Sequence, residues 1–170
     1  MQTVFRSPGG REVIVAPDRP TTLIGERINP SGGKRKRLTQ ALVQRDTDFI
    51  QAEAVAQIEA GADLLDVNVQ AADVYDEPET LAWAVETVLA AVDAPLSIDT
   101  NNPDALKQAL QVAGGRVLIN SITGEERALE RILPLAAEHG AAIIGLTLDD
   151  DGIPTTPEER LRVAGKIVER

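Results

Sequence analysis

Short apolar runs alternate along the chain with longer stretches in which apolar residues recur three and four positions apart. The runs have the length of fully buried strands, whereas the spaced pattern is typical of amphipathic helices. The predicted strands cover residues 21–29, 63–69, 96–99, 116–123 and 141–148. The predicted helices cover residues 46–60, 78–92, 103–113, 125–139 and 157–170. One strand–helix unit is therefore repeated five times.

Proline and glycine mark the limits of this repeat. Residues 3–5 and 11–16 flank the sequence Ser-Pro-Gly-Gly, which predicts a β-hairpin, and a proline-containing linker follows it. We therefore predict a hairpin and linker over residues 1–20 and one main domain over residues 21–170. Residues 30–37 are predicted to form a long loop. Pro134 lies inside a predicted helix and is expected to kink or break it.

Consecutive strand–helix units require a parallel sheet, which is either an open doubly wound sheet or a barrel. The doubly wound alternative calls for a Gly-x-Gly-x-x-Gly turn after the first strand, and the chain has none. A barrel instead places polar side chains at the carboxyl end of every strand, facing one mouth. Such residues follow all the predicted strands: Asn29, Asp66, Asn68, Asp99, Asn101, Asn120, Ser121, Thr147 and Asp149. The predicted fold class is an α/β barrel of the TIM type, represented by its first five units and the hairpin.

Composition narrows the possible functions. The chain has 170 residues, a formal net charge of -10 and a sequence pI near 4.6, which disfavours binding to nucleic acid. It has no cysteine and a single histidine, His139, so thiolate and multi-histidine metal centres are excluded. No apolar run approaches the roughly 20 residues that a membrane span needs. A soluble cytoplasmic protein without a metal site is the prediction.

The strand that ends at Asp99 carries the strongest candidate site. Its sequence is Leu-Ser-Ile-Asp-Thr-Asn-Asn over residues 96–102, so a carboxylate, a hydroxyl and two amides follow an apolar run. Ligands of such folds bind where the strands leave the apolar layer. Asp99 is therefore the central candidate residue.

Several segments together resemble a known family. They are Gly-Glu-Arg-Ile-Asn-Pro (25–30), Leu-Asp-Val-Asn-Val (65–69), Ser-Ile-Asp-Thr-Asn (97–101), Leu-Ile-Asn-Ser (118–121), the segment 136–147 and Asp-Gly-Ile-Pro (151–154). In this order and spacing they resemble the pterin-binding barrel superfamily, and most of all its methyltetrahydrofolate:corrinoid protein methyltransferases. Dihydropteroate synthase and the folate module of cobalamin-dependent methionine synthase belong to the same superfamily.

The resemblance implies a function for the strand ends. Asp99 would accept hydrogen bonds from the 2-amino group and a ring N–H of the pterin, and Asn120 would contact the same edge. Further candidates for the polar lining are Asp66, Asn68, Asn101, Asn29 and Thr147. The implied reaction moves the N5-methyl group of methyltetrahydrofolate to the cob(I)alamin of a corrinoid partner protein. No general acid is evident for N5, so the catalytic residues are not assigned.

Structural roles compete with these assignments. Asp66 could cap the segment that follows it, and Asn29 could shape the turn before Pro30. Thr147 could form a hydrogen bond with a backbone group at the end of its strand. The basic run at residues 34–37 suits a solvated loop or a contact with a folate glutamate tail, and residues 149–151 suit a solvated turn.

Two other functions stay open. One is dihydropteroate synthase-like condensation, although the first loop lacks the Thr-Pro-Asp-Ser-Phe run of that family. The other is a non-catalytic pterin-binding or assembly module. An eight-unit barrel needs roughly 250 residues, so we expect either a longer protein or association with a second copy, such as a homodimer, that covers the open sheet edges.

Overall fold

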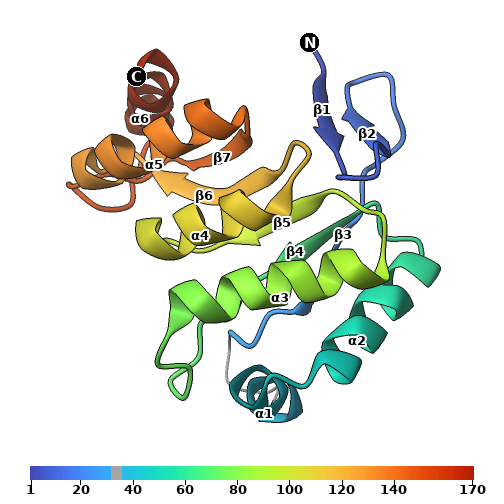
Figure 1. The fold of residues 1–170 in the computed structure, drawn as a ribbon. Helices are drawn as coiled ribbons and strands as arrows, with labels where there is room; N and C mark the ends of the chain where they lie inside the picture. Colours follow the sequence, from blue (N-terminus) through green and yellow to red (C-terminus); the bar gives the residue numbers. More distant parts are fainter. Residues whose placement is uncertain (32–35) are drawn as a thin grey trace.

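A computed structural model of the chain describes residues 1–31 and 36–170. Its main sheet contains β3 (Ile24–Ile28), β4 (Leu64–Val67), β5 (Leu96–Asp99), β6 (Leu118–Thr123) and β7 (Ala142–Leu146). All neighbours are parallel and their spatial order follows the sequence (Figure 1). A doubly wound sheet would reverse its strand order, whereas a barrel does not. The predicted fold class is thereby confirmed, with five units of a barrel.

The helices are α1 (Lys36–Gln44), α2 (Thr47–Glu59), α3 (Glu77–Ala91), α4 (Pro103–Ala113), α5 (Glu126–His139) and α6 (Pro157–Glu169). Figure 1 shows α2, α3 and α4 on one side of the strands. In α4 the buried residues recur at helical spacing, and they pack into the core between helices and sheet: Ala105, Leu106, Ala109, Leu110 and Ala113. No helix in the described ranges has the length and apolar character that a membrane crossing requires.

The expected loop was partly wrong, and of the two outcomes expected at Pro134 the break does not occur. The predicted loop 30–37 ends earlier, because α1 begins at Lys36 and buries Leu38, Ala41 and Leu42, which lie three and four positions apart. Pro134 does not break α5, which runs through it to His139. Pro134 is exposed, so water can solvate the carbonyl that loses its helical partner.

The predicted hairpin is confirmed and closes the amino end of the sheet. Its strands β1 (Thr3–Arg6) and β2 (Glu12–Val15) are antiparallel. Phe5 and Val13 pack against Leu64 and Leu118, the first residues of β4 and β6. Figure 1 shows the hairpin away from α2 and α3, on the far side of the strands. The carboxyl ends of the strands are left as the open mouth.

A close backbone contact holds the hairpin in place. Arg6 and Arg116 exchange two backbone hydrogen bonds, of 3.0 and 2.7 Å. The contact requires glycine at position 115, where a Cβ atom would lie 2.1 Å from the Arg6 carbonyl oxygen and where φ is +66°.

Candidate functional site

Strand register brings the predicted polar residues to one face of the sheet. Asp66 lies opposite Ser97, and Asp99 lies opposite Asn120. Side chains alternate along a strand, so these four face the inside of the incomplete barrel while Val67, Ile98 and Ile119 pack toward the helices. The inner face is therefore apolar near the hairpin and polar at the mouth.

Asp99 is held by two amides from neighbouring strand ends. Its Oδ2 accepts a hydrogen bond from Asn68 Nδ2 at 3.0 Å and from Asn29 Nδ2 at 3.2 Å. Asn68 is 3% exposed, and its own Oδ1 accepts from the backbone N–H of Gln70 at 2.7 Å. Because both amides donate to the same oxygen, they fix the orientation of the Asp99 carboxylate. Within the described ranges, no donor contacts its second oxygen, Oδ1.

Asp66 lies deeper, beneath Asn120. Its Oδ1 accepts from Ser97 Oγ at 2.7 Å and from Asn120 Nδ2 at 3.2 Å, and the residue is fully buried. Its Oδ2 is the one buried side-chain nitrogen or oxygen atom in the described part of the chain that has no hydrogen-bond partner. Burial, with the negative charges of Asp99 and Glu26, raises the pKa of the Asp66 carboxyl to about 6, against the lowering effect of its two hydrogen bonds.

A second layer of hydrogen bonds orders the rim above these carboxylates. Glu77, the first residue of α3, accepts from Thr100 Oγ1 at 2.5 Å, Gln70 Nε2 at 3.1 Å and Asn102 Nδ2 at 3.2 Å. Gln70 Nε2 also donates to Asn101 Oδ1 at 2.9 Å. Asn101 is thus at the exposed rim, one layer above Asp99.

Two clefts border the mouth. The cleft beside β3 and β4 has a volume of about 520 Å³ and includes Ser31, Lys36 and Gln70. The cleft between the ends of β5 and β6 has a volume of about 320 Å³ and includes Asn101, Ser121 and Arg131. A ligand at Asp99 and Asn120 would have polar space on either side.

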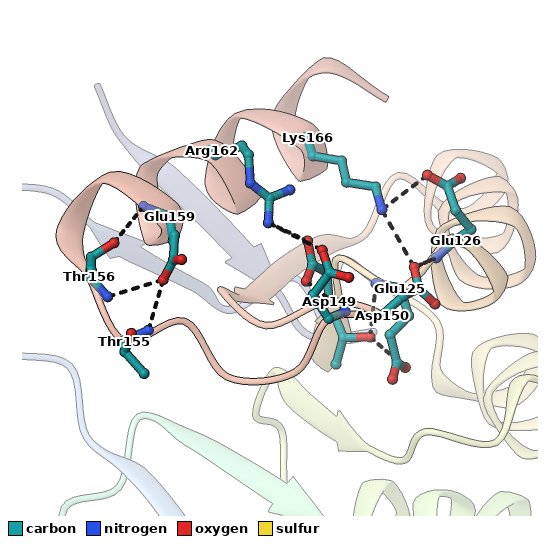
Figure 2. A network of polar contacts seen from close by, with 11 residues as sticks. Glu125, Glu126, Asp149, Asp150, Thr155, Thr156, Glu159, Arg162 and Lys166 are labelled. Atoms are coloured by element: carbon teal, nitrogen blue, oxygen red, sulfur yellow. Dashed lines mark hydrogen bonds and ion pairs between the residues drawn. The ribbon is translucent and has the colours of Figure 1, made fainter.

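Thr147 belongs to a different cluster, at the end of β7. Its hydroxyl accepts from Arg160 Nη1 of α6 at 3.3 Å. Figure 2 shows α6 attached there by ion pairs: Arg162 to Asp149 at 3.0 Å, and Lys166 to Glu126 at 3.0 Å. The prediction of a solvated turn at residues 149–151 was wrong for Asp149, which is 5% exposed.

The structure brings together five of the seven predicted residues: Asn29, Asp66, Asn68, Asp99 and Asn120. The predictions missed Ser97, Gln70 and Glu77. Ser97 had a usable signal, because it lies two residues before Asp99 on the same strand face. Within the basic run, residues 34 and 35 lie outside the described residues. Arg37 stacks on the Phe49 ring at 4.9 Å.

Sequence comparisons agree with this geometry. Residues 25–169 match the profile of a family described as pterin binding enzyme. A methylcorrinoid:tetrahydrofolate methyltransferase of Eubacterium limosum is 34% identical over 149 residues, which are 86% of this chain and 54% of that protein. A methionine synthase of Mycobacterium tuberculosis is 31% identical over 160 residues, which are 90% of this chain and 13% of that protein. The chain spans about half the length of the first relative and a smaller part of the second.

Solved structures share the fold. A dihydropteroate synthase from Thermus thermophilus matches with a TM-score of 0.51 and 25% identity, covering 83% of this chain and 48% of that one. A dihydropteroate synthase from Stenotrophomonas maltophilia matches with a TM-score of 0.54 and 24% identity, covering 91% and 58%. The second likeness concerns the fold alone.

Proposed function

The chain belongs to the family of pterin binding enzymes, and on this premise we propose that Asp99 and Asn120 bind the pterin of a methylated tetrahydrofolate. We further propose that the bound N5-methyl group is exchanged with a corrinoid cofactor carried by a partner protein. Asn68 and Asn29 would hold Asp99, and Asn101 would form the rim. The methyltransferase and methionine synthase relatives support the reaction class.

One observation carries the proposal: the carboxylate of Asp99 is oriented by two amide donors on the same oxygen, while Asn120 lies opposite it on the next strand. A pterin presents a 2-amino group and a ring N–H side by side. Both are donors, so a carboxylate oxygen beside an amide group matches that edge. Pre-oriented acceptors lose little conformational entropy on binding.

The chemistry assigns limited roles to this chain. The cobalt centre of the partner's corrin would supply the methyl-accepting or methyl-donating atom. The single histidine, His139, ends α5 and lies near the amino end of the sheet, so this chain offers no imidazole ligand at the mouth. Proton supply to N5 is required when the methyl group leaves. We assign no general acid, because Asp66, whose pKa is raised, is buried and faces Asn120.

Calorimetry with methyltetrahydrofolate tests the binding site. The change Asp99→Asn replaces a charged acceptor with a neutral amide. Its oxygen can still accept from Asn68 and Asn29, which both donate to Oδ2, but its NH2 group then takes the place of Oδ1 and faces the N–H donors of the pterin. Charge-assisted hydrogen bonds contribute about 1.5–3 kcal/mol, so we expect an affinity loss of about a hundredfold. Asp18→Asn, an exposed aspartate after the hairpin, is the matched control and should bind as the wild type does. Equal affinities of the two variants would contradict the site.

A methyl-transfer assay separates the alternative functions. The Eubacterium limosum relative is named for transfer from a methylcorrinoid to tetrahydrofolate, so both directions need to be measured with a corrinoid acceptor and donor. Condensation of a pterin pyrophosphate with p-aminobenzoate would instead support the dihydropteroate synthase-like function, which the likeness to the Thermus thermophilus enzyme leaves open. Binding without either reaction would identify a non-catalytic pterin-binding module.

Additional β-structure is expected to pair with the sheet. Within the described residues β3 and β7 each pair on one side only, and Ile24 and Leu146 are 39% and 41% exposed. Exposed edges of this kind favour pairing with another chain. We propose that a second copy of this chain or additional polypeptide covers them. Light scattering of these 170 residues alone that finds only monomer with full ligand affinity would contradict this.

A further inference from the structure

The fully buried Asp66 is an unusual residue to place beneath a binding site. Among the described residues its Oδ2 has no hydrogen-bond partner, and both of its hydrogen bonds, from Ser97 and Asn120, go to Oδ1. Neither donor is a cation. A buried carboxylate without a cation lowers stability, so its presence here calls for a role other than holding the fold together.

Asp66 determines how the Asn120 amide is oriented. The amide directs Nδ2 to the carboxylate at 3.2 Å, which turns Oδ1 away from it. The reversed amide would place its oxygen against the carboxylate oxygen, and two acceptors repel each other. A negative charge on Asp66 therefore selects one of two orientations that are otherwise nearly equal in shape.

We propose that Asp66 is a positioning residue, whose carboxylate holds the Asn120 amide with its oxygen toward the mouth and so selects a ligand that presents an N–H donor there. This rests on the proposed pterin site and deepens it. Asp66 itself need not touch the ligand, because the polarised amide transmits its effect. The groups that add negative charge around it are Asp99 of β5 and Glu26 of β3. Together with burial they raise the pKa of Asp66, so protonation in mildly acidic solution would weaken the selection.

The change Asp66→Asn tests the proposal through two measurements, ligand affinity and melting temperature. If Asp66 had only a structural role, both would fall in the variant. The variant keeps the shape and removes the buried charge. We expect an affinity for methyltetrahydrofolate lower by about tenfold, in line with the difference between charged and neutral hydrogen bonds. The melting temperature should stay the same or rise. Binding within about twofold of the wild type, or parallel loss of binding and stability, would overturn the proposal.

Asp149→Asn is the matched control, because Asp149 is also buried but is paired with Arg162. This variant should lose stability and keep its affinity. A double-mutant cycle adds a test of coupling: Asp66→Asn combined with Asn120→Ala should bind no worse than Asn120→Ala alone. Additive losses in the cycle would show that Asp66 acts independently of Asn120.

A measurement without ligand separates this proposal from the proposed function. Side-chain amide NMR of the free protein should show the Asn120 resonance titrating near the pKa of Asp66, about 6, and Asp66→Asn should abolish that titration. A wild type that binds no pterin would refute the proposed function and leave this result intact. An Asn120 resonance unaffected by the Asp66 change would refute the positioning role.

Discussion

The carboxyl end of the sheet holds two buried aspartates with opposite surroundings. Within the part of the chain that the structure describes, Asp66 at β4 receives hydrogen bonds from neutral donors alone and one of its oxygens has no partner. Its pKa is raised to about 6. Asp149 after β7 receives Arg162 at 3.0 Å and the backbone N–H of Asp151. Desolvation acts to raise the pKa of Asp149, but these contacts and Lys166 hold it below its ordinary value.

This difference distinguishes the proposed binding region from a docking region. The network around Asp149 in Figure 2 joins α6 to β7 and α5 through charges of opposite sign. The group around Asp66 and Asp99 concentrates negative charge among amides. Uncompensated charge with perturbed pKa is typical of functional sites, whereas paired charge is typical of element docking.

The largest expected effect is on the pH dependence of stability. The folded pKa of Asp66 is raised from 3.8 to about 6, so the stability linked to this group is fully present below 3.8 and is lost as pH rises through about 6. Relative to Asp66→Asn, the wild type should therefore lose about 3 kcal/mol of unfolding free energy between about pH 3 and pH 7. Denaturant titrations across that range measure this, with Asp18→Asn as control. Parallel curves for the wild type and Asp66→Asn would remove the contrast with Asp149.

The change Arg162→Met tests the other side of the comparison. It keeps the apolar stem but leaves Asp149 buried without its cation, so the pKa of Asp149 should rise. Stability linked to a lowered carboxyl pKa is present above its ordinary value and lost as pH falls through the folded pKa. The variant should unfold at a higher pH in acid and melt a few degrees lower at neutral pH, while ligand affinity stays unchanged. Lys107→Met on α4 is the control, and reduced affinity of Arg162→Met alone would contradict the division into two regions.

A smaller effect is expected from Glu77→Gln. Glu77 is intermediate between the two aspartates, because neutral donors occupy both of its oxygens at the rim. Loss of one acceptor should lower stability by about 1 kcal/mol and affinity by about fivefold, since Gln70 and Asn101 lose their support. Calorimetry and thermal unfolding measure both. Glu79→Gln, an exposed neighbour on the same helix, is the control, and an equal effect there would show that the rim is not specific.

Strand-end chemistry predicted much of this arrangement. Asp99, Asn120 and Asn68 could be predicted because each is a polar residue at the end of an apolar run. The carboxyl ends of parallel strands lie at the same edge of a sheet, whatever the exact strand limits are. The partners of Asp66 were not predictable in the same way. They depend on the register that places Ser97 and Asn120 beside it, and register is a property of paired strands.

Two failures have a common cause in contacts distant along the chain. The acidic turn at Asp149 resembles a solvated loop, but Arg162, which lies on the next helix, pairs with the buried Asp149 carboxylate. The basic segment at Lys36 similarly suggested a loop, although Leu38 and Leu42 behind it pack a helix into the core. A charged segment is predicted to be exposed to solvent from its local composition, and this prediction fails where a helix or strand distant in the sequence covers the segment.

Thr147 provides the smallest predicted effect. Its position after β7 suggested a site residue, but its hydroxyl accepts from Arg160 at 3.3 Å on the docking side of the sheet. Thr147→Ala removes one exposed hydrogen bond, so the melting temperature should change little and affinity should stay within about twofold of the wild type. Thr155→Ala, in the same exposed segment, is the control for the stability measurement. If calorimetry finds that the affinity falls tenfold or more, about 1.4 kcal/mol, Thr147 contributes to ligand binding. The proposed binding region around Asp66 and the docking region around Asp149 would then not be separate.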